Sequence, residues 1–202
     1  MKNSIKNGLE KSISYQEYRG LVTGLLKEEK STGLVQSDEI FNYSKLNNSR
    51  MKRLDKTFHL SEQSKKVVEG LPEKYIWLVI TEGWCGDAAQ ILPVVNKIAE
   101  VSENIDLRIV LRDENENLMN HFLTNGGKAI PKLILLNSDT NEVLDDWGPR
   151  PTDATKMVVE QKEKFGGLDA DFKKELQYWY NTSKGVAIEN DLLDLLNVTQ
   201  SV

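Results

Sequence analysis

The sequence contains only one cysteine, Cys85, so an internal disulfide bond is excluded. It contains only two histidines, His59 and His121, and neither lies at a metal-ligand spacing from the cysteine. The same separation along the chain argues against a Cys–His catalytic pair. We therefore predict neither a metal site nor a protease-type nucleophile.

Long apolar runs are also missing. No stretch approaches the roughly 18 apolar residues of a membrane span, and residues 1–9 lack the apolar core of a secretory signal. We therefore expect no membrane partner and a cytoplasmic location. A net charge of −5 and a pI near 5.2 argue against a general nucleic-acid binder. We interpret the basic run from Lys45 to Lys56 as a solvated helix face.

One stretch organises the expected fold. The apolar, β-branched run Tyr75–Thr81 is typical of a fully buried strand, Glu82 and Gly83 break it, and Trp84–Asp87 forms the turn into a helix. The cysteine, Cys85, therefore lies where a central strand ends and a helix begins. Unpaired backbone N–H groups and the helix dipole favour an anion at such a place. A thiol there can have a lowered pKa, and the thiolate is its reactive form.

The remaining pattern predicts an α/β chain of 202 residues, long enough for one core with helical additions. The first 12 residues are polar, and we expect no regular element there. Further strands are expected at 105–111, 133–136 and 143–147. Helices are expected from Ser14 to about Glu29, from Ser37 to about Phe58, from Ser61 to Leu71, from Asn115 to Asn125, from a Thr152 cap to Phe165, and near 170–182 and 190–197. Ser14 and Glu17 have the spacing of a capping box, and Ser37 can cap the helix that follows it.

Three segments of the sequence resemble segments of a known protein family. Residues 84–88, Trp-Cys-Gly-Asp-Ala, follow a hydrophobic strand and resemble the Trp-Cys-Gly-Pro-Cys active site of the thioredoxin family. Residues 127–136 are similar to the family's cis-proline segment, and residues 142–148 resemble its last strand and terminal glycine. The resemblance implies a thioredoxin-like fold, a central mixed sheet flanked by helices, over residues 72–166. Helical extensions at 1–71 and 167–202 would complete one compact unit.

The resemblance also implies a site. Cys85 would be the nucleophile, and the Ile130–Pro131 bond would be cis and present backbone to an extended substrate. Trp84 would form an apolar floor, and Gly148 would allow close approach of the backbone. The plain alternatives are a small buried cysteine, a core tryptophan and a trans proline opening an edge strand. The substrate-binding residues implied are Trp84, Gly86, Asp87, Ile130, Pro131 and Gly148.

The departures from the family are as informative. Ala88 replaces the second active-site cysteine, and Val79 stands where thioredoxins carry a buried aspartate that accepts a proton. Asp87 replaces the intervening proline, and we expect it to cap the helix, with a proton-carrying role as the alternative. Its charge would raise the pKa of the Cys85 thiol while the helix would lower it, so the sequence leaves the sign open. Lys132 is expected to be solvated.

Two functions remain. The first is a monothiol thiol–disulfide oxidoreductase that uses Cys85 on a protein or peptide disulfide. It would hold no bound cofactor, and glutathione or another small external thiol would resolve the mixed disulfide. The second is a redox-inactive thioredoxin-like module that binds a peptide or protein. A one-cysteine peroxidase is disfavoured because the Pro-x-x-x-Thr-x-x-Cys pattern is missing.

Overall fold

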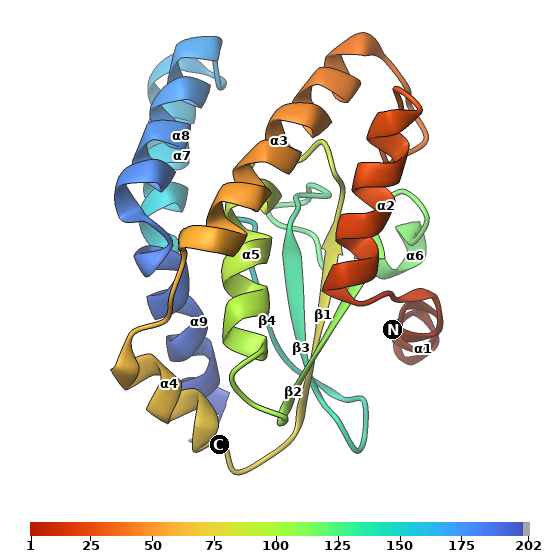
Figure 1. The fold of residues 1–202 in the computed structure, drawn as a ribbon, viewed down its shortest axis with the longest axis vertical. Coiled ribbons are helices and arrows are strands. Elements are labelled where there is room, and N and C mark those ends of the chain that lie inside the picture. The colour runs from red at the N-terminus through yellow and green to blue at the C-terminus, as the bar shows by residue number, and fades with distance from the viewer. Residues whose placement is uncertain (200–202) are drawn as a thin grey trace.

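The structure of the protein is a computed structural model, and it describes residues 1–199. Its centre is a four-stranded mixed sheet in the order β2-β1-β3-β4, flanked by helices (Figure 1). β1 runs parallel to β2 and antiparallel to β3, and β3 runs antiparallel to β4. The α/β, thioredoxin-like fold expected from the sequence is confirmed. The strands are β1 (Tyr75–Thr81), β2 (Ile105–Leu111), β3 (Lys132–Asn137) and β4 (Val143–Trp147).

The helices are distributed over both ends of the chain as well as its middle. Only α5 and α6 lie between the first and last strands of the described chain. The helices are α1 (Lys2–Lys11), α2 (Tyr15–Lys27), α3 (Asp38–Thr57), α4 (Glu62–Glu69), α5 (Ala88–Ala99), α6 (Glu116–Met119), α7 (Thr152–Phe165), α8 (Ala170–Ser183) and α9 (Val186–Thr199).

The centre of the sheet is β1, whose seven residues are buried except for the half-buried Ile76. A parallel neighbour needs a crossover connection, and α5 supplies it between β1 and β2. Eleven of the twelve residues of α5 are buried, because the helix is covered by the sheet on one side and by α3 on the other. This explains why its sequence is apolar over most of its surface. The start of α5 is thereby held rigidly at the end of β1.

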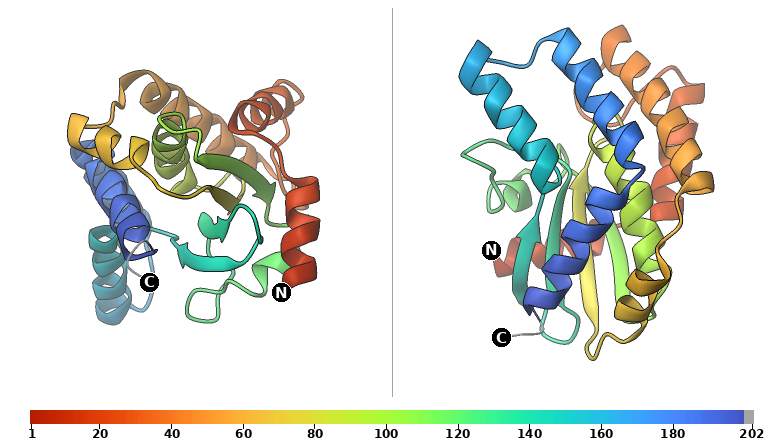
Figure 2. Two further views of the ribbon diagram at one scale, coloured as in Figure 1. Left: turned by 90° about the horizontal axis from the view of Figure 1, so that it is seen from below. Right: turned by 90° about the vertical axis from the view of Figure 1, so that its left-hand side faces the viewer.

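The helical additions pack against this core rather than extending from it. Beside β2, α1 contacts α6, and Gly8 of α1 lies close to Leu118 and to Leu78 of the central strand. At the other end of the chain, α7 and α8 form an antiparallel pair, and α9 returns to contact α5 and β4 (Figure 2). As a result α8 and α3 face each other across the start of α5.

Several local predictions are confirmed. Ser14 and Glu17 form a complete capping box at α2, and Ser37 caps α3 through its side chain. Each of these signals acts over three residues, so it is readable from the sequence. The strands at 75–81, 105–111 and 143–147 have the expected bounds.

Other local predictions are wrong. The first 12 residues are not irregular but form α1, which buries Ile5 and Gly8 against the core. The helix expected from Asn115 to Asn125 is limited to the four residues of α6, because a two-way backbone pairing of Thr124 with Gly127 forms a turn there.

The two C-terminal expectations also need correction. Thr152 is the first residue of α7 and not its cap, and its backbone N–H and hydroxyl both donate to Asp191 instead. The last helix begins at Val186, four residues earlier than expected. No helix of the described residues is long and apolar enough to cross a membrane.

Candidate functional site

The cysteine lies at the junction that the sequence indicates, between the end of β1 and the first turn of α5. The Cys85 amide donates to the Glu82 carbonyl over 3.2 Å, which closes the turn. Its sulfur is 3.5 Å from the amide nitrogen of Ala88 in the first turn of the helix. The thiol donates to the carbonyl oxygen of Ile130 over 3.2 Å, and the Ile130–Pro131 peptide bond is cis. The structure therefore brings together Cys85, Ile130 and Pro131, three of the residues that the resemblance singled out.

The state of this thiol is decided by burial. Cys85 is only 7% exposed, and burial, followed by the charge of Asp87, raises its pKa to about 12. The amides of Ala88 and Asp87 and the charge of Arg150 act in the opposite direction but are weaker. The expectation that a helix N-terminus would lower the pKa is thus outweighed, because the sulfur is removed from water. At neutral pH the resting thiol is protonated.

Asp87 does not cap α5, contrary to the prediction. It occupies the N-cap position, but its side chain accepts no capping hydrogen bond. Its buried carboxylate instead forms an ion pair with Arg150 over 2.7 Å and accepts a hydrogen bond from the Tyr180 hydroxyl over 3.0 Å. Burial raises the pKa of this carboxyl, while Arg150 acts against the rise. The two partners hold the charge of Asp87 two residues after the cysteine.

These two partners were not found by sequence reasoning. Arg150 follows the matched terminal glycine, Gly148, by two residues, and only this closeness could have marked it. Tyr180 lies in α8, 93 residues from Asp87, in a segment whose aromatic residues predict docking onto the core. Neither residue carries a local pattern that points to a carboxylate. Their contacts with Asp87 depend on how the segment after β4 packs against the core.

Residues that precede β1 form hydrogen bonds with the other side of the turn before Cys85. The Gly83 amide donates to the Thr32 hydroxyl over 2.7 Å, and the Asn47 side chain donates to the Gly83 carbonyl over 3.1 Å. Glu82 is fully buried, and one of its oxygens accepts from the Asp113 amide over 3.0 Å. Burial raises the pKa of the Glu82 carboxyl group, while the Thr32 side chain and the Asp113 amide act in the opposite direction. The turn before the cysteine is therefore held by α3, by the loop between α2 and α3, and by the residues that follow β2.

The remaining predicted residues lie around the same point. Trp84 is half-buried, and the Arg112 guanidinium carbon lies 4.8 Å from the centre of its ring. Gly148 has a φ of +116°, and a Cβ there would lie 2.4 Å from the carbonyl oxygen of Pro131, so only glycine fits. Lys132 is not solvated as predicted: it is buried and paired with Asp146 over 2.7 Å.

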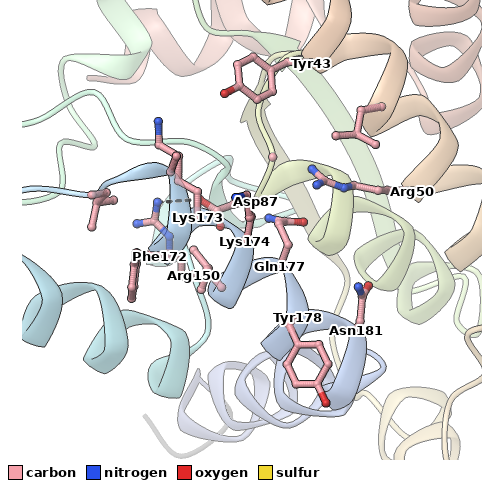
Figure 3. Close-up of a pocket in the computed structure, with 15 residues that line it drawn as sticks. Tyr43, Arg50, Asp87, Arg150, Phe172, Lys173, Lys174, Gln177, Tyr178 and Asn181 are labelled. Atoms are coloured by element: carbon pink, nitrogen blue, oxygen red, sulfur yellow. Dashed lines mark ion pairs between the residues drawn. The ribbon is translucent and has the colours of Figure 1, made fainter.

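A pocket opens next to the site on the side of Gly86. Its volume is about 590 Å³, and its walls come from α3 and α8, with Gly86, Asp87 and Arg150 contributing from the core (Figure 3). Cys85, Ile130 and Pro131 do not line it. Among residues 1–199, no three or more His, Cys, Asp or Glu side chains gather in a way that could hold a metal ion.

Comparison with known proteins agrees with this fold. The chain superposes on an HIV epitope scaffold for 4E10 with a TM-score of 0.56 at 18% identity, over 92% of this chain and 98% of the scaffold. It superposes on a protein of unknown function from Pseudomonas aeruginosa with a TM-score of 0.57 at 16% identity, over 94% of this chain and 98% of that one. At such identities the likeness concerns the fold alone.

The sequence comparison identifies the family. No curated protein matches the chain. A family model described as thioredoxin matches residues 33–166, a span that contains Cys85, Pro131 and Gly148. That span begins in the N-terminal helical region and ends with α7, so it includes the whole sheet. The chain belongs to the thioredoxin family.

Proposed function

We propose that the protein is a monothiol thiol–disulfide oxidoreductase with Cys85 as its nucleophile. The observation that carries this proposal is the place of the sulfur. It lies in the first turn of α5, 3.5 Å from the Ala88 amide, and 3.2 Å from the carbonyl that precedes the cis proline, Pro131. Backbone groups beside a nucleophilic sulfur are suited to hold a substrate disulfide in line for attack.

With glutathione as the external thiol, the reaction would have two exchange steps. The Cys85 thiolate attacks the glutathione sulfur of a glutathionylated protein, the mixed disulfide on Cys85 forms, and the protein leaves as a thiolate that takes up a proton. A second glutathione thiolate then attacks the glutathione sulfur of that mixed disulfide. Glutathione disulfide is released, and the Cys85 thiolate is restored. Because the second thiol is external, the alanine at position 88 is compatible with turnover.

The raised pKa limits the rate of this chemistry. A thiol with a pKa of about 12 is thiolate in only about one molecule in 10⁵ at pH 7, but its thiolate is intrinsically more nucleophilic. Combining the two effects leaves Cys85 on the order of 10²-fold slower than a thiol with a pKa of 7. The protein would therefore be a slow enzyme that works where small thiols are supplied, as in the cytoplasm.

The second candidate is a redox-inactive module that binds a peptide or protein. It is favoured by one specific observation: the only thiol is 7% exposed and protonated at neutral pH. Two further features agree, since Ala88 and Val79 replace both the second thiol and the buried carboxylate of the thioredoxin cycle. In this case the surface near the cis proline would serve recognition alone.

One experiment separates the two candidates. The native protein is incubated with a glutathionylated peptide, and mass spectrometry follows the transfer of glutathione to Cys85. Release of glutathione disulfide is followed in parallel through glutathione reductase. Transfer to the native protein with catalytic release, both absent in Cys85→Ser, would support the oxidoreductase. Transfer only after unfolding in urea would rule it out and leave the binding module.

A further inference from the structure

The pocket beside Gly86 combines cationic and apolar side chains. Four of its lining residues are cations, and Asp87 is its one carboxylate, in a protein whose net charge is −5. Arg150 is already paired with Asp87. Within residues 1–199, no carboxylate lies within ion-pair distance of Arg50 or Lys173. The pocket therefore has uncompensated positive charge, which favours an anionic occupant.

Two hydrogen-bond donors meet above Gly86. A Cβ at this position would lie 3.7 Å from Nη1 of Arg50, which comes from α3, and 3.6 Å from Nε2 of Gln177, which comes from α8. The side-chain oxygen of Gln177 accepts a hydrogen bond from the amide of Gln90 over 2.9 Å. This bond orients Gln177 so that its amide nitrogen faces Gly86. Gly86 directly precedes Asp87, the N-cap residue of α5, so the helix N-terminus adds to the attraction for an anion.

The orientation of Gln177 is itself supported. Gln90, in the first turn of α5, is buried and accepts a hydrogen bond from Arg53 Nη2 over 3.3 Å. Arg50 donates to the Asn47 side chain over 2.9 Å. Burial followed by the charge of Arg53 lowers the pKa of Arg50, and the charge of Asp87 acts in the opposite direction. Arg50 is half removed from water and forms no direct ion pair with a described residue, so an anion bound against it would stabilise its charge. A ligand carboxylate would form a charge-assisted hydrogen bond with the Arg50 guanidinium.

Away from these donors the pocket is apolar. Tyr43 and Leu46 of α3 and Tyr178 of α8 are 42%, 48% and 72% exposed at its rim, and Leu168 and Phe172 line it from the α7–α8 side. Figure 3 shows Tyr43 and Tyr178 on opposite sides of the space into which Arg50 and Gln177 point. The volume of about 590 Å³ is in the range of small-molecule sites. Such a lining accommodates a hydrocarbon or aromatic body.

We propose that this pocket binds a small apolar carboxylate. The carboxylate lies above Gly86 and accepts hydrogen bonds from Arg50 and Gln177, and the apolar body lies between α3 and α8 against Tyr43 and Tyr178. The ligand is a small molecule with one anionic head and an apolar body of about ten heavy atoms, consistent with the pocket volume. This inference is independent of the proposed redox chemistry, because Cys85 does not line the pocket.

The test uses decanoate as the probe and the full-length protein. Isothermal titration calorimetry should show saturable binding of decanoate with one site per chain, and binding of the neutral analogue decanol at least tenfold weaker. Arg50→Met should weaken decanoate binding by about tenfold or more, equivalent to about 1.4 kcal/mol. Lys45→Met removes the same charge from an exposed position of α3 outside the pocket, and it should leave the affinity unchanged.

Three outcomes would overturn the inference: no saturable binding of decanoate, equal affinity for decanol, or equal losses in Arg50→Met and Lys45→Met. Gln177→Leu provides a second variant, should Arg50→Met melt at a much lower temperature than the parent protein. It should weaken decanoate binding while leaving decanol binding unchanged. Cys85→Ser should bind decanoate like the parent protein, so a failure of the redox proposal would not affect this result.

Discussion

The Asp87–Arg150 ion pair sets two opposite charges near the Cys85 thiol, so removing one or the other should change its reactivity in opposite directions. The charge of Asp87 raises the pKa of the thiol, and the charge of Arg150 lowers it. Asp87→Asn should therefore make Cys85 react faster with a disulfide at pH 8, and Arg150→Gln should make it react more slowly. Both substitutions keep a side chain that can hydrogen-bond to the former partner.

The size of the effect follows from the charges. Neutralising one charge close to a buried thiol shifts its pKa by about one unit, which corresponds to about 1.4 kcal/mol and a tenfold change in thiolate population. The intrinsic nucleophilicity of the thiolate changes in the opposite sense by about threefold. We therefore expect the exchange rate to rise about threefold in Asp87→Asn and to fall about threefold in Arg150→Gln.

The assay is the reaction with the uncharged disulfide 4,4′-dithiodipyridine, followed by absorbance. Because Cys85 is the only cysteine, Cys85→Ser supplies the blank. Each rate is measured well below the melting temperature of the variant. Both substitutions break the same ion pair, so loosened packing alone would speed up both variants. That result, or unchanged rates in both, would refute the electrostatic explanation.

Three further predictions concern stability. Burial raises the folded-state pKa of Glu82 above its ordinary 4.5, so the free energy of unfolding should fall as the pH rises from about 4.5 through that pKa. Glu82→Gln should therefore have a higher melting temperature than the parent protein at pH 7.5, and its melting temperature should change less between pH 5 and 7.5. Gly148→Ala places a Cβ against the Pro131 carbonyl and should cost about 3 kcal/mol or more in urea unfolding, whereas Gly126→Ala, also at positive φ but in open space, should cost about 1 kcal/mol. Tyr180→Phe should lower the unfolding free energy by about 1–2 kcal/mol in the same assay, and no change would show that its bond to the buried carboxylate contributes nothing.

Much of the local structure could be predicted from the sequence because its signals are short in range. A β-branched apolar run predicts β1, Ser14 with Glu17 predicts the capping of α2, and Ser37 predicts the capping of α3. The break at Glu82–Gly83 before a helical pattern places Cys85 at a strand–helix junction, which the structure shows. The amphipathic pattern of α1 was missed because its buried face consists of few residues, among them Gly8.

The candidate site depended on contacts that no local pattern contains. Asp87 occupies the N-cap position of α5, yet its carboxylate forms an ion pair with Arg150 and accepts a hydrogen bond from Tyr180. Both partners belong to the C-terminal part of the chain. Lys132 looked like a surface residue, but β3 lies inside the sheet, so its side chain is buried and pairs with Asp146. Pairings of this kind are set by how distant segments pack.

The family, the strands of the sheet and the position of the cysteine could be predicted from neighbouring residues, because strand and helix periodicity and motif spacing are local features of the chain. The protonation state of the Cys85 thiol, in contrast, depends on the tertiary structure. Burial of Cys85, together with the charge of Asp87, outweighs the helix N-terminus that favours a thiolate. The physical reason is that removal from water depends on every segment that covers the sulfur, whereas the helix dipole depends only on the segment that follows it.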